Sequence, residues 1–325
     1  MKPKYISLLV LLFFTTSLIG QKNSLSLLND RFYLTFPDSA KNIARGTDIM
    51  SADPNANNET RVIYDIGDKR IVFFAQELYL KTIDKLEEKL AKESTQDNPF
   101  TTKLIFNADS AMCITLTPVK FNDKQQAILI NSIIIKNADN LLSKLSVYLN
   151  PKAFEDKKTF DKITEQVFAS FKKGSRKVNT SARTESFSIF DTKTTLLLKL
   201  PKDYIVTRDK KYDFEVYKIK KVQAYGVDDH ADLVIYFGFH SSYFSNEFQL
   251  TGSKTADTDG EFMRQKTKWL NYEDKKKGII LREQLFIDDD IQKDVQIHIA
   301  MIAGKQRQIE ELAAIVKDIL IKYDK

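Results

Sequence analysis

Several residue types are scarce in this chain of 325 residues, and each scarcity narrows what the protein can be. The single cysteine, Cys113, excludes a disulfide within the chain. It lies in a strand-like apolar run without metal-ligand spacing, so we expect a buried, unreactive thiol. The three histidines, His230, His240 and His298, show no recognised ligand spacing either. We therefore expect three unrelated histidines on polar strand faces and no metal site.

The motifs of the commonest enzyme classes are also missing. The sequence has no Gly-x-Ser-x-Gly elbow, no Gly-x-x-x-x-Gly-Lys phosphate loop, no Gly-x-Gly-x-x-Gly fingerprint and no His-Glu-x-x-His motif. Residues 257–260 begin like a calcium loop, but the glycine is one position early and Lys268 stands where the bidentate glutamate belongs. Carboxylates such as Glu283 are expected at the surface. The sequence thus predicts no catalytic residue, no cofactor and no metal ion.

Composition and charge describe an ordinary globular chain. Hydrophobic residues make up 42% and charged residues 29%, and the length suits two domains of typical size. The formal charge is +6, and we interpret the densest basic run, 172–177, as part of a solvated linker. A docking strip for an anionic partner is the alternative. Aromatic and basic residues do not interleave, so we expect no nucleic-acid partner.

The first twenty residues have the pattern of a secretory signal peptide. Lysines precede an apolar core of 14 residues, 6–19, and the small Gly20 offers a cleavage point. A membrane-spanning helix needs about 20 apolar residues, so we expect cleavage after Gly20 and no stable transmembrane span afterwards. An uncleaved anchor is the alternative, because Leu18 is not a preferred residue before a cleavage site. The expected location is the periplasm or the cell exterior.

Two short stretches open similar halves of the remaining chain. Apolar side chains alternate over residues 32–36 before Pro37, and over residues 196–200 before Pro201. A period of two predicts a strand with one buried face, and proline ends each strand because it cannot continue the ladder.

Each half continues with strands and closes on an amphipathic helix. Apolar residues recur at helical spacing from Phe160 to Phe171, with a glycine cap expected near Gly174, and from Ile309 to Tyr323. Middle helices are expected at 81–93 and 261–272. Short polar turns predict antiparallel strand neighbours. The expected strands are 61–66, 70–80, 112–121, 127–136 and 141–149 in the first half, and 214–222, 233–239, 279–287 and 295–302 in the second.

The matched order of elements predicts a duplicated domain. We expect an α+β fold of two tandem domains, each an antiparallel sheet flanked by helices in an α/β/α sandwich, because this arrangement buries both kinds of apolar face. The alternative is one continuous large domain. The predicted boundaries are a signal peptide at 1–20, a first domain at 21–174, a linker at 175–190 and a second domain at 191–325.

The proline-ended strands and the closing helix at 163–171 resemble those of PsbP/DcrB-like α/β/α sandwich proteins. In that group the first strand ends at a proline, as at Pro37 and Pro201, and the last helix often closes on a Ser-Phe pair, as at 170–171. The second half departs from the pattern with leucine and isoleucine at 320–321. The resemblance implies a largely non-enzymatic accessory, chaperone or assembly role, and it assigns no functional residue.

Aromatic residues supply the one candidate binding surface. Tyr243, Phe244 and Phe248 lie among serines and an asparagine in an expected loop, and Trp269 follows later. Because polar neighbours leave these rings less obviously buried, we predict that they form a docking surface. Packing onto their own domain is the alternative.

Together these features predict an exported, non-catalytic binding or assembly factor of the bacterial cell envelope. We expect a protein partner in the envelope, and an apolar small molecule held between sheet and helices is the alternative ligand. The competing hypothesis is an envelope hydrolase that uses scattered carboxylates with His240 or His298. A deep polar pocket around those groups would favour the enzyme.

Overall fold

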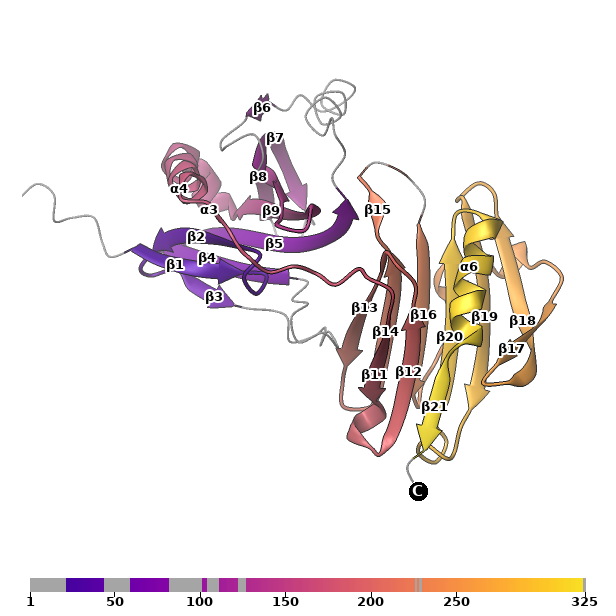
Figure 1. Ribbon diagram of the computed structural model, residues 1–325. Helices are drawn as coiled ribbons and strands as arrows, with labels where there is room; N and C mark the ends of the chain where they lie inside the picture. Colours follow the sequence, from indigo (N-terminus) through magenta and orange to yellow (C-terminus); the bar gives the residue numbers. More distant parts are fainter. Residues whose placement is uncertain are drawn as a thin grey trace, which may run out of the picture. The chain divides into compact units, whose positions relative to one another are not determined.

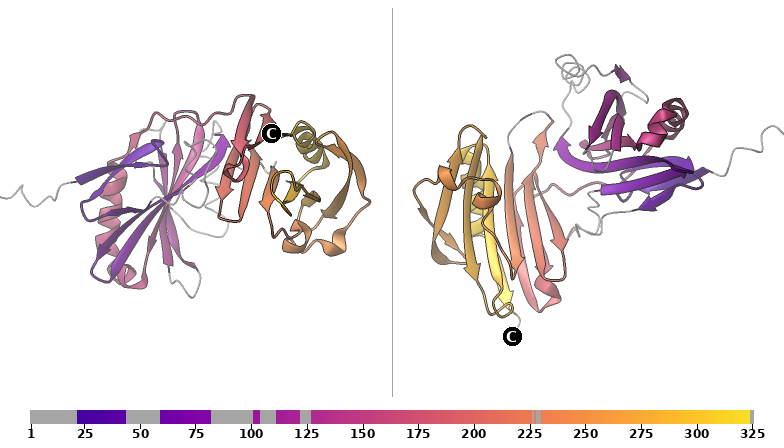
Figure 2. Two further views of the ribbon diagram at one scale, coloured as in Figure 1. Left: turned by 90° about the horizontal axis from the view of Figure 1, so that it is seen from below. Right: turned by 180° about the vertical axis from the view of Figure 1, so that it is seen from behind.

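The computed structural model describes residues 22–43, 59–81, 101–103, 111–121, 127–225, 227 and 230–323. Within these ranges the chain forms twenty-one β-strands and four α-helices (Figures 1 and 2). The residues belong to two compact units. Val178 and the residues after it, together with 79–81, form the second unit, and the remaining described residues form the first.

The expected α/β/α sandwich is wrong, because the chain is mostly β and is built from large antiparallel sheets. One cause is the segment 261–272, which was expected to be a helix and instead lies in two strands. The other expected middle helix begins at Lys81, which ends a strand, and 82–93 lies outside the described residues.

The first unit contains a small sheet of order β1-β2-β10 and a large sheet in which seven strands follow the order β3-β4-β5-β9-β8-β7-β6. The predicted hairpin around Gly67 and the predicted meander from 112 to 149 are confirmed. The elements are β1 (Lys22–Leu27), β2 (Phe32–Pro37), β3 (Lys41–Ile43), β4 (Glu59–Ile66), β5 (Lys69–Lys81), β6 (Thr101–Lys103), β7 (Ala111–Phe121), β8 (Ala127–Lys136), β9 (Leu141–Leu149), α3 (Pro151–Glu155), α4 (Lys157–Ala169) and β10 (Lys172–Lys173).

The closing helix of the first unit is confirmed as α4, and it buries Phe160, Val167 and Phe168 in the core. It ends at Ala169, so the expected glycine cap near Gly174 is wrong. Gly174 has a different role. Its N–H donates to the carbonyl of Arg31 at 2.9 Å, and a Cβ atom at this position would lie 1.9 Å from the carbonyl oxygen of Asp30. Part of the basic run at 172–177 therefore belongs to the first unit and packs closely against residues 30–31.

A charged network is buried inside the first unit. The Nε atom of Arg31 lies 2.5 Å from Oε1 of Glu77, and its NH1 group donates to Asp139 at 2.6 Å. The Ser143 hydroxyl donates to the same Glu77 carboxylate at 3.2 Å. Burial raises the pKa of Glu77 above its ordinary value, although the charge of Arg31 opposes this. The side chains of Arg31 and Glu77 are both fully buried, so each depends on the other for its solvation.

The second unit contains a small sheet of order β11-β12-β21 and a large sheet of order β13-β14-β16-β20-β19-β18-β17. The predicted hairpin of 279–287 with 295–302 is confirmed. The elements are β11 (Arg183–Ser188), β12 (Thr194–Leu200), β13 (Tyr204–Lys210), β14 (Phe214–Lys221), β15 (Gln223–Ala224), β16 (Ala231–Gly238), α5 (Phe244–Glu247), β17 (Thr258–Phe262), β18 (Gln265–Asp274), β19 (Ile279–Ile287), β20 (Gln296–Ala303), α6 (Gln306–Lys317) and β21 (Leu320–Tyr323).

The two units share one plan. In each small sheet the central strand is the one that ends at the proline (β2, at Pro37) or directly before it (β12, before Pro201). Its neighbours are the strand before it in the chain and the strand that follows the last helix. In each large sheet three strands in chain order are followed by four strands in reverse order, if the two-residue β15 is set aside. Pro37 and Pro201 thus mark equivalent positions in two similar topologies.

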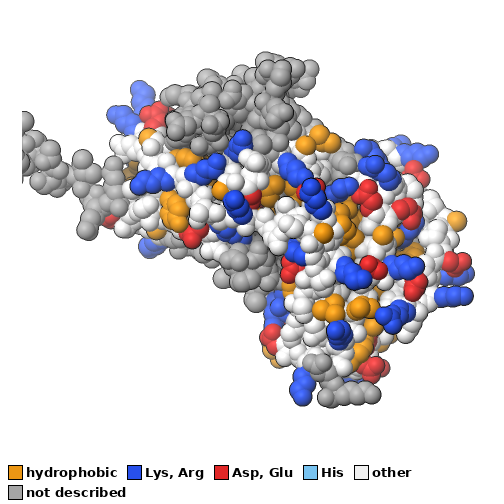
Figure 3. All heavy atoms as spheres, viewed as in Figure 1, with side chains coloured by type: hydrophobic (Ala, Val, Ile, Leu, Met, Phe, Trp, Pro, Cys, Tyr) orange, Lys and Arg blue, Asp and Glu red, His pale blue; other side chains and the backbone are white. Residues whose placement is uncertain are grey.

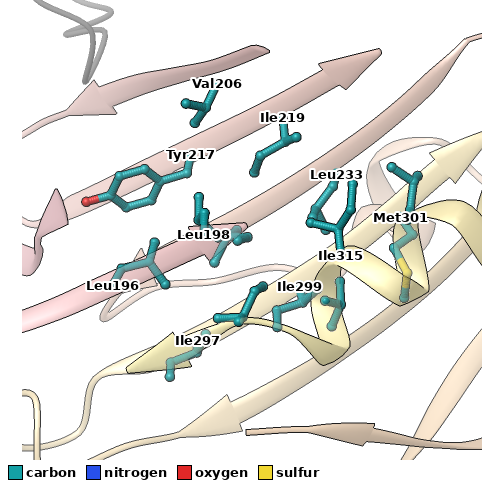
Figure 4. Close-up of a cluster of buried hydrophobic side chains, with 14 of the residues drawn as sticks. Leu196, Leu198, Val206, Tyr217, Ile219, Leu233, Ile297, Ile299, Met301 and Ile315 are labelled. Carbon is teal, nitrogen blue, oxygen red and sulfur yellow. The ribbon is translucent and has the colours of Figure 1, made fainter. Parts of the chain in front are cut away.

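The large sheet of the second unit is covered on both faces. Helix α6 lies over β16, β20 and β19 (Figure 1). It shares a core with the small sheet and one face of the large sheet, as Figure 4 shows for Leu198, Ile299 and Ile315. On the opposite face lies the α5 segment, which we define as residues 243–250 around α5. Its Phe244 and Leu250 pack with side chains of the sheet. Buried side chains therefore fill the space between α6 and the sheet.

Two details of the second unit differ from the sequence prediction. In place of the expected helix at 261–272, β17 and β18 form a hairpin through Met263 and Arg264, both with positive φ (51° and 64°). Residues other than glycine, asparagine and aspartate rarely adopt this backbone conformation. Because methionine and arginine occupy both positions, the sequence shows none of the usual signs of a hairpin turn. The closing helix α6 is confirmed but ends at Lys317, and 320–323 form β21 beside β12.

Candidate functional site

Two places in the second unit bring chemically capable side chains together. One is a buried polar cluster beneath the α5 segment, formed by Ser241, Glu283 and His298. The other is a groove between the β17–β18 hairpin and α6.

The polar cluster is a chain of two side-chain hydrogen bonds. The Ser241 Oγ and His298 Nδ1 atoms are 2.8 Å apart, and His298 Nε2 and Glu283 Oε2 are 3.0 Å apart. Since a carboxylate only accepts, Nε2 of His298 is the donor to Glu283. Two neighbouring strands place Glu283 and His298, which lie on β19 and β20. His298 is on the sheet face opposite Ile297 and Ile299, as the alternation predicted. Glu283 and His298 are fully buried, so the expectation of a surface Glu283 is wrong.

The Glu283 carboxylate also holds the backbone of the α5 segment. It accepts hydrogen bonds from the N–H groups of Phe244 at 2.8 Å and Ser245 at 3.2 Å. Burial alone would raise the pKa of Glu283, but the hydrogen bonds from His298 and Ser245 outweigh it and leave the pKa below its ordinary value. Glu283 is therefore ionised at neutral pH and ties the α5 segment to the sheet.

The structure brings three of the four predicted aromatic residues together. The rings of Tyr243 and Phe244 lie 5.5 and 5.0 Å from the ring of His298, and Phe248 stacks on Phe244 at 6.3 Å. Tyr243 and Phe244 are half-buried, and Phe248 is 36% exposed. Trp269 is elsewhere: it lies on β18, is 3% exposed and belongs to the main core.

The sequence contains no motif that links Ser241, Glu283 and His298. The one sequence feature that points to the cluster is a polar residue in each strand of the predicted hairpin: Glu283 in 279–287 and His298 in 295–302. Both interrupt a strand that is otherwise rich in apolar residues. Among the described residues, no group of three or more histidines, cysteines and carboxylates is arranged to hold a metal ion.

The groove has a volume of about 1000 Å³, with Ala313, Ala314 and Trp269 among its lining residues. Its charged residues are mixed but more often basic: Arg264, Lys266, Lys268, Arg282 and Lys317 against Asp259, Glu261 and Glu310. Figure 3 shows the same interleaving of Lys and Arg with Asp and Glu over the face of the second unit that carries α6.

Arg282 is the buried charge of the groove, with its side chain 9% exposed. Its Nε donates to the side-chain oxygen of Asn271 at 2.9 Å, which fixes the guanidinium plane. Its NH2 donates to Glu310 at 2.9 Å, and Glu310 lies on the exposed side of α6. A second pair across the groove joins Lys317 and Glu261 at 3.5 Å. The groove thus has a fixed cation inside and exposed charges around it.

No family model, curated protein or solved structure matches the chain. None of the helices in the described ranges has the length and apolar character needed to cross a membrane.

Proposed function

We propose that this protein is an exported, non-catalytic binding factor of the bacterial cell envelope, and that the groove between α6 and the β17–β18 hairpin holds a segment of a protein partner. The groove is the observation that carries the proposal, because it combines a volume of about 1000 Å³ with the small apolar side chains of Ala313 and Ala314 and a fixed guanidinium. The apolar segment at 6–19 supports export. The PsbP/DcrB-like resemblance carries no weight here, because the sandwich fold that it implied is not the fold observed.

A photo-crosslinking amino acid at Ala314 tests this function in intact cells. Ala314 is exposed and lines the groove, whereas Tyr212 is fully exposed on a loop of the same unit and serves as the control position. We expect a discrete protein adduct from position 314 and none of that mass from position 212. The adduct should disappear when Ala313→Trp fills the groove in the same chain. An absent adduct, the same adduct from both positions, or an adduct that survives Ala313→Trp would contradict the proposal.

A second candidate function is hydrolysis, and the hydrogen-bond chain of Ser241, His298 and Glu283 favours it. In such an enzyme His298 would take the Ser241 proton at Nδ1 while Glu283 oriented the ring through Nε2. We favour binding, because the rings of Tyr243 and Phe244 pack against this histidine and both it and Glu283 are fully buried.

A fluorophosphonate probe, which labels activated serines, separates the two functions. We expect no labelling of the purified protein, because the cluster holds the α5 segment in place and has no catalytic role. Ser242 is the control position, because its exposed hydroxyl donates to Glu247 at 2.9 Å. Labelling that is lost in Ser241→Ala and kept in Ser242→Ala would instead establish the hydrolase.

A further inference from the structure

We infer that the groove recognises an acidic polypeptide segment, one of whose carboxylates replaces Glu310 on Arg282. The inference rests on the proposed binding function and specifies its ligand. Its starting point is a carboxylate that already lies in the groove. Glu310 accepts hydrogen bonds from NH2 of Arg282 at 2.9 Å and from NH1 at 3.5 Å. This two-pronged contact is the geometry by which an arginine recognises a carboxylate.

The two partners of this ion pair are held very differently. Arg282 is 9% exposed and fixed by Asn271, so it stays in position when Glu310 leaves. The Glu310 side chain is 57% exposed, and its other contact is Gln306 on its own helix at 2.7 Å. Water solvates the exposed Glu310 carboxylate well once it leaves, and the ligand carboxylate keeps the buried guanidinium of Arg282 paired. A ligand carboxylate can therefore take the place of Glu310 at little cost.

The charge of the groove selects an acidic ligand. Beyond Arg282 and Lys317, three more basic residues line it, Arg264, Lys266 and Lys268, and all three are exposed. The five basic residues exceed the three acidic ones, and displacement of Glu310 adds one further uncompensated cation. Neighbouring acidic side chains of one polypeptide would meet the fixed guanidinium and these exposed lysines together.

Fluorescence anisotropy with a labelled Gly-Ser peptide that carries regularly spaced glutamates tests the inference on the purified protein. Glu310→Gln should tighten binding about fivefold, because it removes the internal competitor. The matched control Glu273→Gln removes the same charge from an exposed position outside the groove and should leave the affinity unchanged. Arg282→Lys should weaken binding about tenfold, because the lysine ammonium group cannot make the paired hydrogen bonds of a guanidinium to a carboxylate. Lys266→Ser with Lys268→Ser should weaken it too, with less dependence on salt.

Several results would overturn the inference: equal binding of a peptide with glutamine in place of glutamate, no tightening by Glu310→Gln, or binding of dextran sulfate without binding of the peptide. If Arg282→Lys fails to fold, Glu310→Gln and the lysine pair still decide the question. An adduct at Ala314 without peptide binding would leave the proposed function standing and remove this inference. Failure of both measurements would remove both.

Discussion

Replacement of Arg31 by methionine is expected to lower the free energy of unfolding of the first unit by about 3–5 kcal/mol. The substitution leaves the Glu77 carboxylate fully buried without the guanidinium that lies 2.5 Å from it. Asp139 also loses its bond at 2.6 Å. Leaving a buried charge without its partner is one of the few effects of a single substitution that lower the free energy of unfolding this much.

The protein offers an internal reference for this measurement. Trp269, the only tryptophan, lies in the core of the second unit, so its fluorescence follows that unit, whereas far-ultraviolet circular dichroism follows both. We expect Arg31→Met to shift the dichroism transition in denaturant and to leave the Trp269 transition in place. The double variant Arg31→Met with Glu77→Leu should recover about 2 kcal/mol, since an apolar pair avoids the buried charge. A loss below about 1 kcal/mol in the single variant would show that the network contributes only what a surface ion pair does.

Glu283→Gln is expected to destabilise the second unit by about 3 kcal/mol at pH 7. Both carboxylate oxygens accept hydrogen bonds, from the Phe244 and Ser245 N–H groups and from Nε2 of His298. Glutamine offers one acceptor oxygen and turns an NH₂ group toward a donor, so at least one buried N–H group loses its partner. The Trp269 fluorescence transition should report the loss.

The effect of Glu283→Gln should also depend on pH. The pKa of Glu283 is lowered in the folded protein from its ordinary value of 4.5. The stability that ionised Glu283 contributes is therefore complete above pH 4.5 and is lost as the pH falls through the folded-state pKa. The difference in unfolding free energy between wild type and variant should be constant from pH 7 to about pH 5 and shrink below it. A difference that grows on acidification would contradict the assigned role of Glu283.

Local patterns in the sequence were sufficient for much of the secondary structure. Alternation placed β2, β12 and the β19–β20 hairpin correctly, and helical spacing located α4 and α6. These elements are amphipathic, so their periodicity reports directly which face is buried. The helix expected at 261–272 failed because its apolar residues, such as Phe262 and Trp269, are compatible with two strands as well as with one helix. The turn between those strands consists of Met263 and Arg264 and lacks the glycine, asparagine or aspartate that usually occupies a hairpin turn.

The layer arrangement and the candidate site required tertiary information. Residues 320–323 continue the apolar pattern of α6 in sequence, yet they form β21 because β12 offers them a strand to pair with. The groove exists only because β17 and β18 pair beside α6. Ser241 and His298 are 57 residues apart, and no local pattern links them. Polar neighbours predicted exposed rings at Tyr243 and Phe244, but both are half-buried because Glu283 holds the backbone of Phe244 and Ser245 on the sheet.

Methyl-detected NMR would test most directly whether the groove, and not the aromatic segment, is the binding surface. Ala313 and Ala314 line the groove, whereas Ile279 and Ile302 pack in the cluster that contains Phe244, so their methyl groups report the two surfaces separately. The protein labelled at alanine and isoleucine methyls would be titrated with the partner segment crosslinked at position 314. We predict that the signals of Ala313 and Ala314 shift and those of Ile279 and Ile302 stay in place. Shifts at the two isoleucines with unchanged alanine signals would contradict the groove and favour the aromatic surface.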